Sequence, residues 1–306
     1  MSLESPDVVV TMTAILSTMF AVLAGLVYIQ QPSSSTKSSF YPDPIAEPSK
    51  YAYEMYHSFY SPIWMCVFGC IVVFQLYEEW SAREYNLYLF ILALPCVLQP
   101  ILFPSGFSNS PDSKKPIMER FATKANIWLA TYTFIGNYWY THYFYSVLKA
   151  KYTMPSTRLN NVPIAMFFAT MFYFSSYHVF SNCMLRKIKT SFAPTIQRRV
   201  LYIMAVCVLS YFTAFMETLT ISSFPYYSFE DRNMAYTVGS AFYGIYFLVS
   251  FPAFLEFDRD VDNKSVNARK VTSWDAFVQS CGYGMMIMCL LDFVRLYLDI
   301  PLIVGA

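Results

Sequence analysis

Long apolar runs, separated by short polar or proline-containing stretches, dominate the pattern of this 306-residue chain. A helix needs about 20 mainly apolar residues to cross the roughly 30 Å hydrocarbon core of a bilayer. Eight runs are long enough, and we expect each to form a membrane-spanning helix. They cover residues 8–29, 62–80, 85–103, 125–148, 162–183, 200–223, 235–255 and 276–298.

The composition supports an all-α polytopic membrane protein. Hydrophobic residues make up 56% of the chain and charged residues only 13%, whereas a soluble domain carries about 25% charged residues. We predict an N-terminal anchor followed by a seven-helix bundle. The chain then divides into an N-terminal extension over 1–47, with one anchor and a Ser/Pro-rich linker, and a membrane-embedded domain over 48–306.

Several function classes lack support in the composition. The net charge of +1 gives no electrostatic basis for binding nucleic acid. No glycine-rich phosphate loop is present, so a nucleotide-driven pump is not expected. The seven cysteines lie in apolar runs without a CxxC pair, which favours packing over disulfides. No HxxxH pair predicts a metal site.

Lysine and arginine are distributed unevenly over the connections between the runs. The stretches 30–61, 104–124, 184–199 and 256–275 carry 15 of the 21 lysine and arginine residues. The positive-inside rule places these four stretches in the cytosol and both termini on the opposite side. In an internal eukaryotic membrane, that opposite side is the lumen.

Polar residues inside the fourth run form rows along a helix. Such residues are costly in a membrane and are therefore candidates for a functional site. Thr133, Asn137 and Thr141 stand four residues apart on one face, and Tyr138 shares the next stripe with His142. Hydrogen bonding between helices is the alternative explanation for this pattern.

Glu217 is the strongest single candidate for a functional residue in the sequence. It lies six residues before the end of the sixth run, which places it roughly 9 Å below the interface at the helical rise per residue. No basic residue lies within four positions of it on its own helix. Desolvation should therefore keep the carboxyl protonated and able to donate a proton, unless a cation from another helix pairs with it.

Asp292 and His178 are candidate site residues, but a structural role would also explain the presence of each inside the membrane. Asp292 and Arg295 are one helical turn apart in the last run, a spacing that suits an intrahelical ion pair. His178 is expected near the cytosolic end of the fifth run, where a bond to a backbone carbonyl would account for it.

Glu78 ends the second run, close to two further carboxylates around the same turn. Mutual repulsion would disfavour ionisation of one of them, although solvation at the interface would also explain them. Under the predicted orientation, four acid–base groups fall at similar depth in the half of the membrane nearest the lumen. We therefore predict one aromatic chamber that contains Glu78, His142, Glu217 and Asp292.

Short motifs over about five-sixths of the chain occur in a specific order. They are Pro48-Ser-Lys, Leu76-Tyr-Glu-Glu79, Lys124-Ala-Asn-Ile-Trp128, Gly136-Asn-Tyr138, Thr141-His-Tyr-Phe144, Asn160-Asn-Val-Pro163, Tyr177-His178, Phe224-Pro-Tyr-Tyr227, Asp231-Arg232, Ile245-Tyr-Phe and Val249-Ser-Phe-Pro252. Together they resemble cycloeucalenol cycloisomerases, the cyclopropylsterol isomerases of sterol synthesis in photosynthetic eukaryotes. Members of that family usually begin near Pro48, so the run at 8–29 is a departure from the family pattern.

The resemblance implies a multi-pass isomerase of the endoplasmic reticulum membrane that opens the 9β,19-cyclopropane ring of a sterol. Cycloeucalenol would become obtusifoliol, with no cofactor and no nucleotide, and the partners would be the sterol and membrane lipid. An acid must protonate C19, and a proton must leave C8. Aromatic faces would stabilise the carbocation between these steps, and a lipid-embedded chamber would exclude water.

The candidate residues fit this chemistry. We expect Glu217 and His142 to be proton donor and acceptor, in either order, with Asp292 as a third catalytic group that orients them together with Asn137. Residues expected to bind the substrate are Asn137, Tyr138, Trp139, Glu78, Tyr243 and His178.

Two other functions remain open from the sequence. A Δ8–Δ7 sterol isomerase would also protonate and deprotonate a buried steroid. A sterol-binding or sterol-transport protein could use the same chamber without chemistry, although the absence of internal repeats disfavours an inverted-repeat transporter.

Overall fold

The computed structural model describes residues 6–34, 38–106, 109–221, 224, 226–265, 267–302 and 304, and these form an all-α fold. The long helices are α1 (Pro6–Tyr28), α2 (Pro48–Val73), α3 (Ala82–Leu102), α4 (Phe121–Ile135), α6 (Ile164–Ser191), α7 (Ile196–Ile221), α9 (Ser240–Leu255) and α10 (Ser273–Tyr297). Shorter segments are η1 (Leu76–Glu79), η2 (Pro111–Lys114), η3 (Ile117–Glu119), η4 (Gly136–Tyr140), α5 (Thr141–Val147), α8 (Arg232–Met234) and η5 (Ala235–Gly239).

Within the described part of the chain, strands are limited to two short antiparallel ladders. Strand β1 (Lys151–Tyr152) pairs with β4 (Tyr227–Ser228), and β2 (Arg158–Leu159) pairs with β3 (Val162–Pro163). The predicted all-α class is therefore confirmed.

Six helices, counted over the described residues, are long and apolar enough to cross a membrane. These are α1, α2, α3, α7, α10 and the continuous helix of η5 and α9. The predicted spans at 125–148 and 162–183 are also helical, but they fall outside this group. The first is divided by η4, and α6 carries a polar face with His178 and Asn182. The polytopic character is confirmed, and eight crossings remain a prediction.

Two helices extend further than their apolar runs. Helix α2 begins at Pro48 rather than at residue 62, and α6 continues to Ser191 rather than ending at 183. The additional turns contain Glu54 on α2, which is only 2% exposed, and Arg186 on α6. Because these two charges pair inside the protein, the helices accommodate polar residues that interrupt the apolar pattern. Residues 74–80, predicted as helix, instead form a bend and η1.

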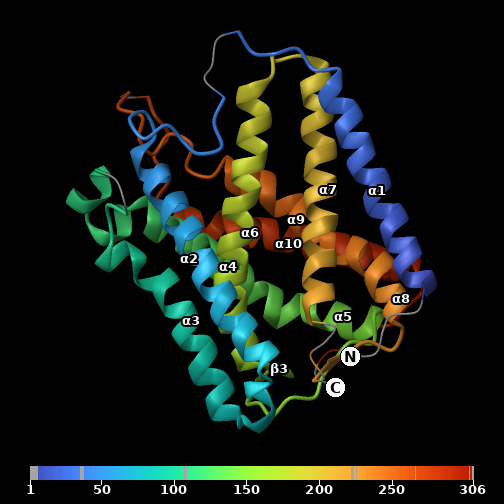
Figure 1. Cartoon of the computed structure of the whole chain (residues 1–306). Coiled ribbons are helices and arrows are strands. Elements are labelled where there is room, and N and C mark those ends of the chain that lie inside the picture. Colours follow the sequence, from blue (N-terminus) through green and yellow to red (C-terminus); the bar gives the residue numbers. More distant parts are fainter. Residues whose placement is uncertain are drawn as a thin grey trace.

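Helix α6 lies at the centre of the bundle. It packs against α2 and α3 on one side and against α7 and α9 on the other. Figure 1 shows α6 between α2 and α7, with α1 along the outer side of α7, and α9 and α10 crossing behind them. The largest buried cluster joins α4, α6, α9 and α10, and a second joins α2, α3 and α6. The core is therefore divided around α6.

The N-terminal anchor packs on the bundle. Met12 of α1 is buried together with Tyr211 and Phe215 of α7, and the rings of Phe20 and Phe212 lie 5.7 Å apart. The described part of the following linker runs along the end of α6, where the Ser33 amide donates to the Ser191 carbonyl at 2.9 Å. The division of the chain at residue 47 remains a prediction.

Candidate functional site

A cavity lies between α2, α3, the α4–η4–α5 helix, α6, α7 and α9. The volume of this cavity is about 150 Å³, and the cavity is partly open to its surroundings. Its aromatic lining residues are Phe68, Tyr77, Trp80, Tyr85, Tyr132, Phe144, Tyr152, Tyr173, Phe174, Phe224, Tyr227, Phe229, Tyr243 and Tyr246.

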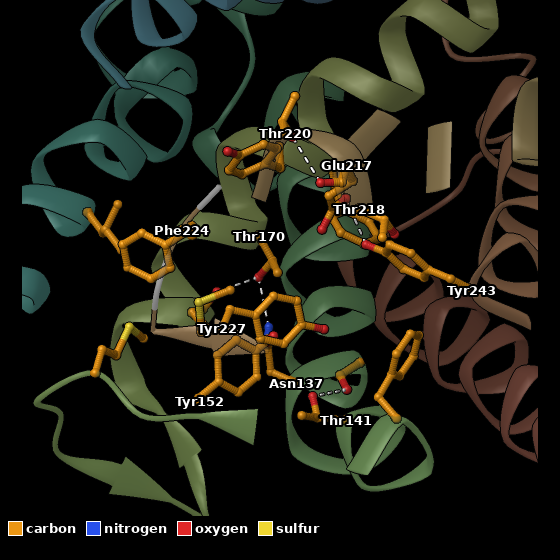
Figure 2. A pocket seen from close by; sticks show the side chains of 18 of the residues that line it. Asn137, Thr141, Tyr152, Thr170, Glu217, Thr218, Thr220, Phe224, Tyr227 and Tyr243 are labelled. Carbon is orange, nitrogen blue, oxygen red and sulfur yellow. Dashed lines mark hydrogen bonds between the residues drawn. The ribbon is translucent and has the colours of Figure 1, made fainter. Parts of the chain in front are cut away.

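Glu217 provides the carboxyl group of this cavity. The Tyr243 hydroxyl donates a hydrogen bond to Glu217 Oε2 at 2.8 Å, and the Tyr177 hydroxyl lies close to the same carboxyl. Among the described lining residues, Glu217 is the only acidic one, and there is no lysine, arginine or histidine. No ion pair to Glu217 occurs in the described ranges. Figure 2 shows Glu217 and Tyr243 facing each other across this wall.

The polar residues predicted on one face of the fourth span lie at the cavity. Thr133, Asn137 and Thr141 all line the cavity. Asn137 donates through Nδ2 to the Thr133 carbonyl at 2.9 Å and to Thr170 Oγ1 at 2.8 Å. This row therefore serves both as an interhelical contact and as a polar strip on an otherwise aromatic wall.

Two π-helical turns, η4 and η5, lie at the cavity and contribute Gly136 and Gly239 to its wall. A π turn holds one extra residue, disturbs the regular carbonyl pairing and occurs frequently at functional sites. Near η4, the Tyr138 carbonyl accepts from Asn160 Nδ2 at 2.7 Å. Asn160 and Asn161 both have positive φ, which is typical of the tight turn of a hairpin such as β2–β3.

Tyr152 and Tyr227 form a stacked pair on the β1–β4 ladder at one end of the cavity. Their rings are 4.4 Å apart with an interplanar angle of 15°, and both line the cavity. Burial raises the pKa of each hydroxyl well above its ordinary value. Both therefore stay neutral at physiological pH and can donate hydrogen bonds.

The structure does not place His142 or Asp292 on the cavity wall. His142 is 1% exposed and packs against the ring of Tyr145, with a centroid distance of 5.6 Å. Asp292 Oδ1 accepts from Arg295 Nη2 at 2.6 Å, the intrahelical pair that the spacing suggested. Tyr143 is 3.5 Å from the same oxygen. Of the acid–base groups Glu217, His142 and Asp292, only Glu217 lies on the described wall of the cavity.

Four predicted substrate-binding residues also lie off the wall. His178 bonds to the Phe174 carbonyl at 2.7 Å and to Ser250 Oγ at 2.9 Å, as its structural explanation required. Glu78 and Trp139 are exposed. Tyr138 stacks on Phe134 at 5.6 Å. Of the predicted substrate-binding residues, Asn137 and Tyr243 line the cavity.

Tyr177, Thr170, Tyr152 and Tyr227 belong to the site but were not predicted as site residues. Tyr177 and Tyr227 occur in the family motifs, which is the signal that could have singled them out. Thr170 and Tyr152 carry no such signal, because Thr170 is a common residue type in an apolar helix and Tyr152 lies between two apolar runs of the sequence. Within the described ranges, no group of three His, Cys, Asp or Glu side chains could hold a metal ion.

Fold and site together define a polytopic helical membrane protein with an internal aromatic chamber. Cycloeucalenol cycloisomerase of Arabidopsis thaliana is 39% identical to this chain over 257 residues, covering 82% of this chain and 87% of the relative. The chain therefore belongs to the cycloeucalenol cycloisomerase family, and this membership implies an isomerase enzyme. No family model and no solved structure matches the chain.

Proposed function

We propose that this protein opens the 9β,19-cyclopropane ring of a cycloeucalenol-like sterol in the endoplasmic reticulum membrane and forms obtusifoliol. Family membership supports the reaction. The observation that carries the proposed mechanism is the position of Glu217 on an aromatic wall, where no cation of the described residues pairs with it.

Glu217 is the proposed proton donor. Its proton passes to C19, the bond between C9 and C19 breaks, and C19 becomes a methyl group. The positive charge that develops at C9 is lost when a proton leaves C8 and the C8=C9 double bond forms. One proton enters and one leaves, so the reaction needs neither a redox partner nor a nucleotide.

The aromatic walls support the carbocation in this scheme. Tyrosine and phenylalanine faces attract a cation through their ring quadrupoles, and Tyr243 bonds directly to the donor carboxyl. After donation, the Glu217 carboxylate is an anion facing the cation and is one candidate acceptor of the C8 proton. His142, which follows Thr141 of the wall, is the other.

The reaction is tested by incubating membranes that contain the protein with cycloeucalenol in D₂O and analysing the sterols by mass spectrometry. We expect obtusifoliol with one deuterium in its C19 methyl group, because only ring opening creates a methyl group with a new hydrogen. A Δ7 product from a Δ8 sterol would instead support a Δ8–Δ7 isomerase. Cycloeucalenol recovered bound but unchanged, beside an active relative, would favour a sterol-binding or transport protein.

His142→Gln is expected to lower kcat far less than removal of the Glu217 carboxyl, by about tenfold or less. The physical reason is that His142 does not line the described wall, so its effect on the substrate would be indirect. A general acid or base in direct contact contributes about 10²- to 10⁴-fold. Single-turnover rates of the variant measure this, and a loss within that range would identify His142 as the proton acceptor.

A further inference from the structure

The side-chain amide of Asn137 has one fixed orientation. Its Nδ2 group points at the Thr133 backbone carbonyl, 2.9 Å away, and at Thr170 Oγ1, 2.8 Å away. A carbonyl oxygen only accepts hydrogen bonds. The amide group that faces Thr133 must therefore be the NH₂ group, and Oδ1 must point elsewhere.

Thr170 reinforces this orientation from the neighbouring helix. Its hydroxyl has one proton, which it donates to the Met166 carbonyl at 3.0 Å. It is therefore an acceptor toward Asn137, and a rotated amide would set two oxygen acceptors against each other. Figure 2 shows Asn137 bonded to Thr170 in the cavity, with Tyr152 and Tyr227 beside them.

Oδ1 of Asn137 remains as an acceptor toward the cavity. Asn137 is 6% exposed and lines the cavity wall, and no donor from the described residues bonds to Oδ1. Threonine hydroxyls on the same wall, such as that of Thr218, can rotate between donating and accepting. The Asn137 oxygen cannot, so a ligand that fills this cavity must bring a donor or leave a buried acceptor unpaired.

We propose that Asn137 Oδ1 is a hydroxyl-recognition subsite that accepts the hydrogen bond of the sterol 3-hydroxyl. This rests on the proposed function, which supplies a sterol whose single polar group is that hydroxyl. The subsite and Glu217 lie on different helices of one cavity, so the anchored hydroxyl fixes which part of the ring system faces Glu217. The subsite distinguishes a 3-alcohol from a 3-ketone or a 3-methyl ether, since these two carry no donor.

The test compares cycloeucalenol with its 3-ketone and its 3-methyl ether, by equilibrium binding to purified protein and by kcat/KM. We expect the alcohol to be preferred by about ten- to hundredfold, because an unpaired buried acceptor weakens binding by that order. Asn137→Leu should abolish the preference. Thr218→Val, which also removes a hydroxyl from the wall, should keep it.

Thr170→Val gives a second readout. It removes one of the two acceptors that hold the amide, while the Thr133 carbonyl still accepts from Nδ2 at 2.9 Å. The amide is then held less firmly, so the preference for the alcohol over the 3-ketone should narrow by about two- to fivefold without reversing. Equal binding of alcohol and ketone by the unaltered protein would overturn the subsite. So would an alcohol preference retained in full in Asn137→Leu. Selective binding without ring opening would instead overturn the proposed function and leave the subsite standing.

Discussion

Replacing Glu217 by glutamine is expected to lower kcat for ring opening by about 10³-fold, within the range for loss of a general acid. Glutamine can still accept the hydrogen bond that Tyr243 now donates at 2.8 Å, so the wall should keep its shape. It cannot donate an acidic proton to C19. Substrate binding should change little, because the variant removes a proton and not a contact. Single-turnover conversion of cycloeucalenol in detergent or lipid nanodiscs measures the effect.

Glu79→Gln is the matched control for this variant. Glu79 is exposed at the end of η1, so the same change of carboxyl to amide there should leave the rate within about twofold. Glu217→Gln with the full rate would show that another group protonates C19. A variant that loses activity together with sterol binding would point to a disturbed cavity, and Glu217→Asp would then separate acidity from shape.

The apolar runs predicted the fold class because membrane-spanning helices must bury every backbone polar group internally. They could not place the ends of α2 and α6. Those ends carry Glu54 and Arg186, which are separated by 132 positions in sequence, and only tertiary contact neutralises them. A prediction from apolar residues alone assigns Glu54 and Arg186 to loops, although both residues are helical in the structure.

The site was predicted in part for a related reason. Glu217 and the row of Thr133, Asn137 and Thr141 follow from cost and periodicity, which a single helix defines. Which other helix faces the cavity depends on packing angles that the sequence does not show. His142 and Asp292 were expected at the depth of Glu217, but depth alone does not set rotation about the helix axis. His142 instead packs against Tyr145, and Asp292 pairs with Arg295.

Replacing Arg186 by methionine is expected to lower the free energy of unfolding by about 3–5 kcal/mol, as for other buried ion pairs that lose one partner. Arg186 donates from Nη1 to Glu54 Oε2 and from Nη2 to Glu54 Oε1, both at 2.7 Å. The Glu54 side chain is 3% exposed. Without the guanidinium, the hydrogen bond that the described residues leave to this carboxylate is that of the Asn182 amide, 3.0 Å from Oε1. Lys50, one turn away on α2, then supplies a positive charge without a hydrogen bond to Glu54. Thermal and denaturant unfolding in detergent micelles measure the loss.

Lys189→Met is the matched control on the same helix. Lys189 pairs with Glu256, but the two side chains are 40% and 45% exposed, and exposed pairs contribute about 0–1 kcal/mol. The double variant Glu54→Leu/Arg186→Met should recover most of the lost stability, because it removes the stranded carboxylate as well. Equal losses for Arg186→Met and Lys189→Met would contradict this account. A double variant no more stable than Arg186→Met would show instead that Arg186 stabilises the bundle through its hydrogen bond to the Phe40 carbonyl rather than through Glu54.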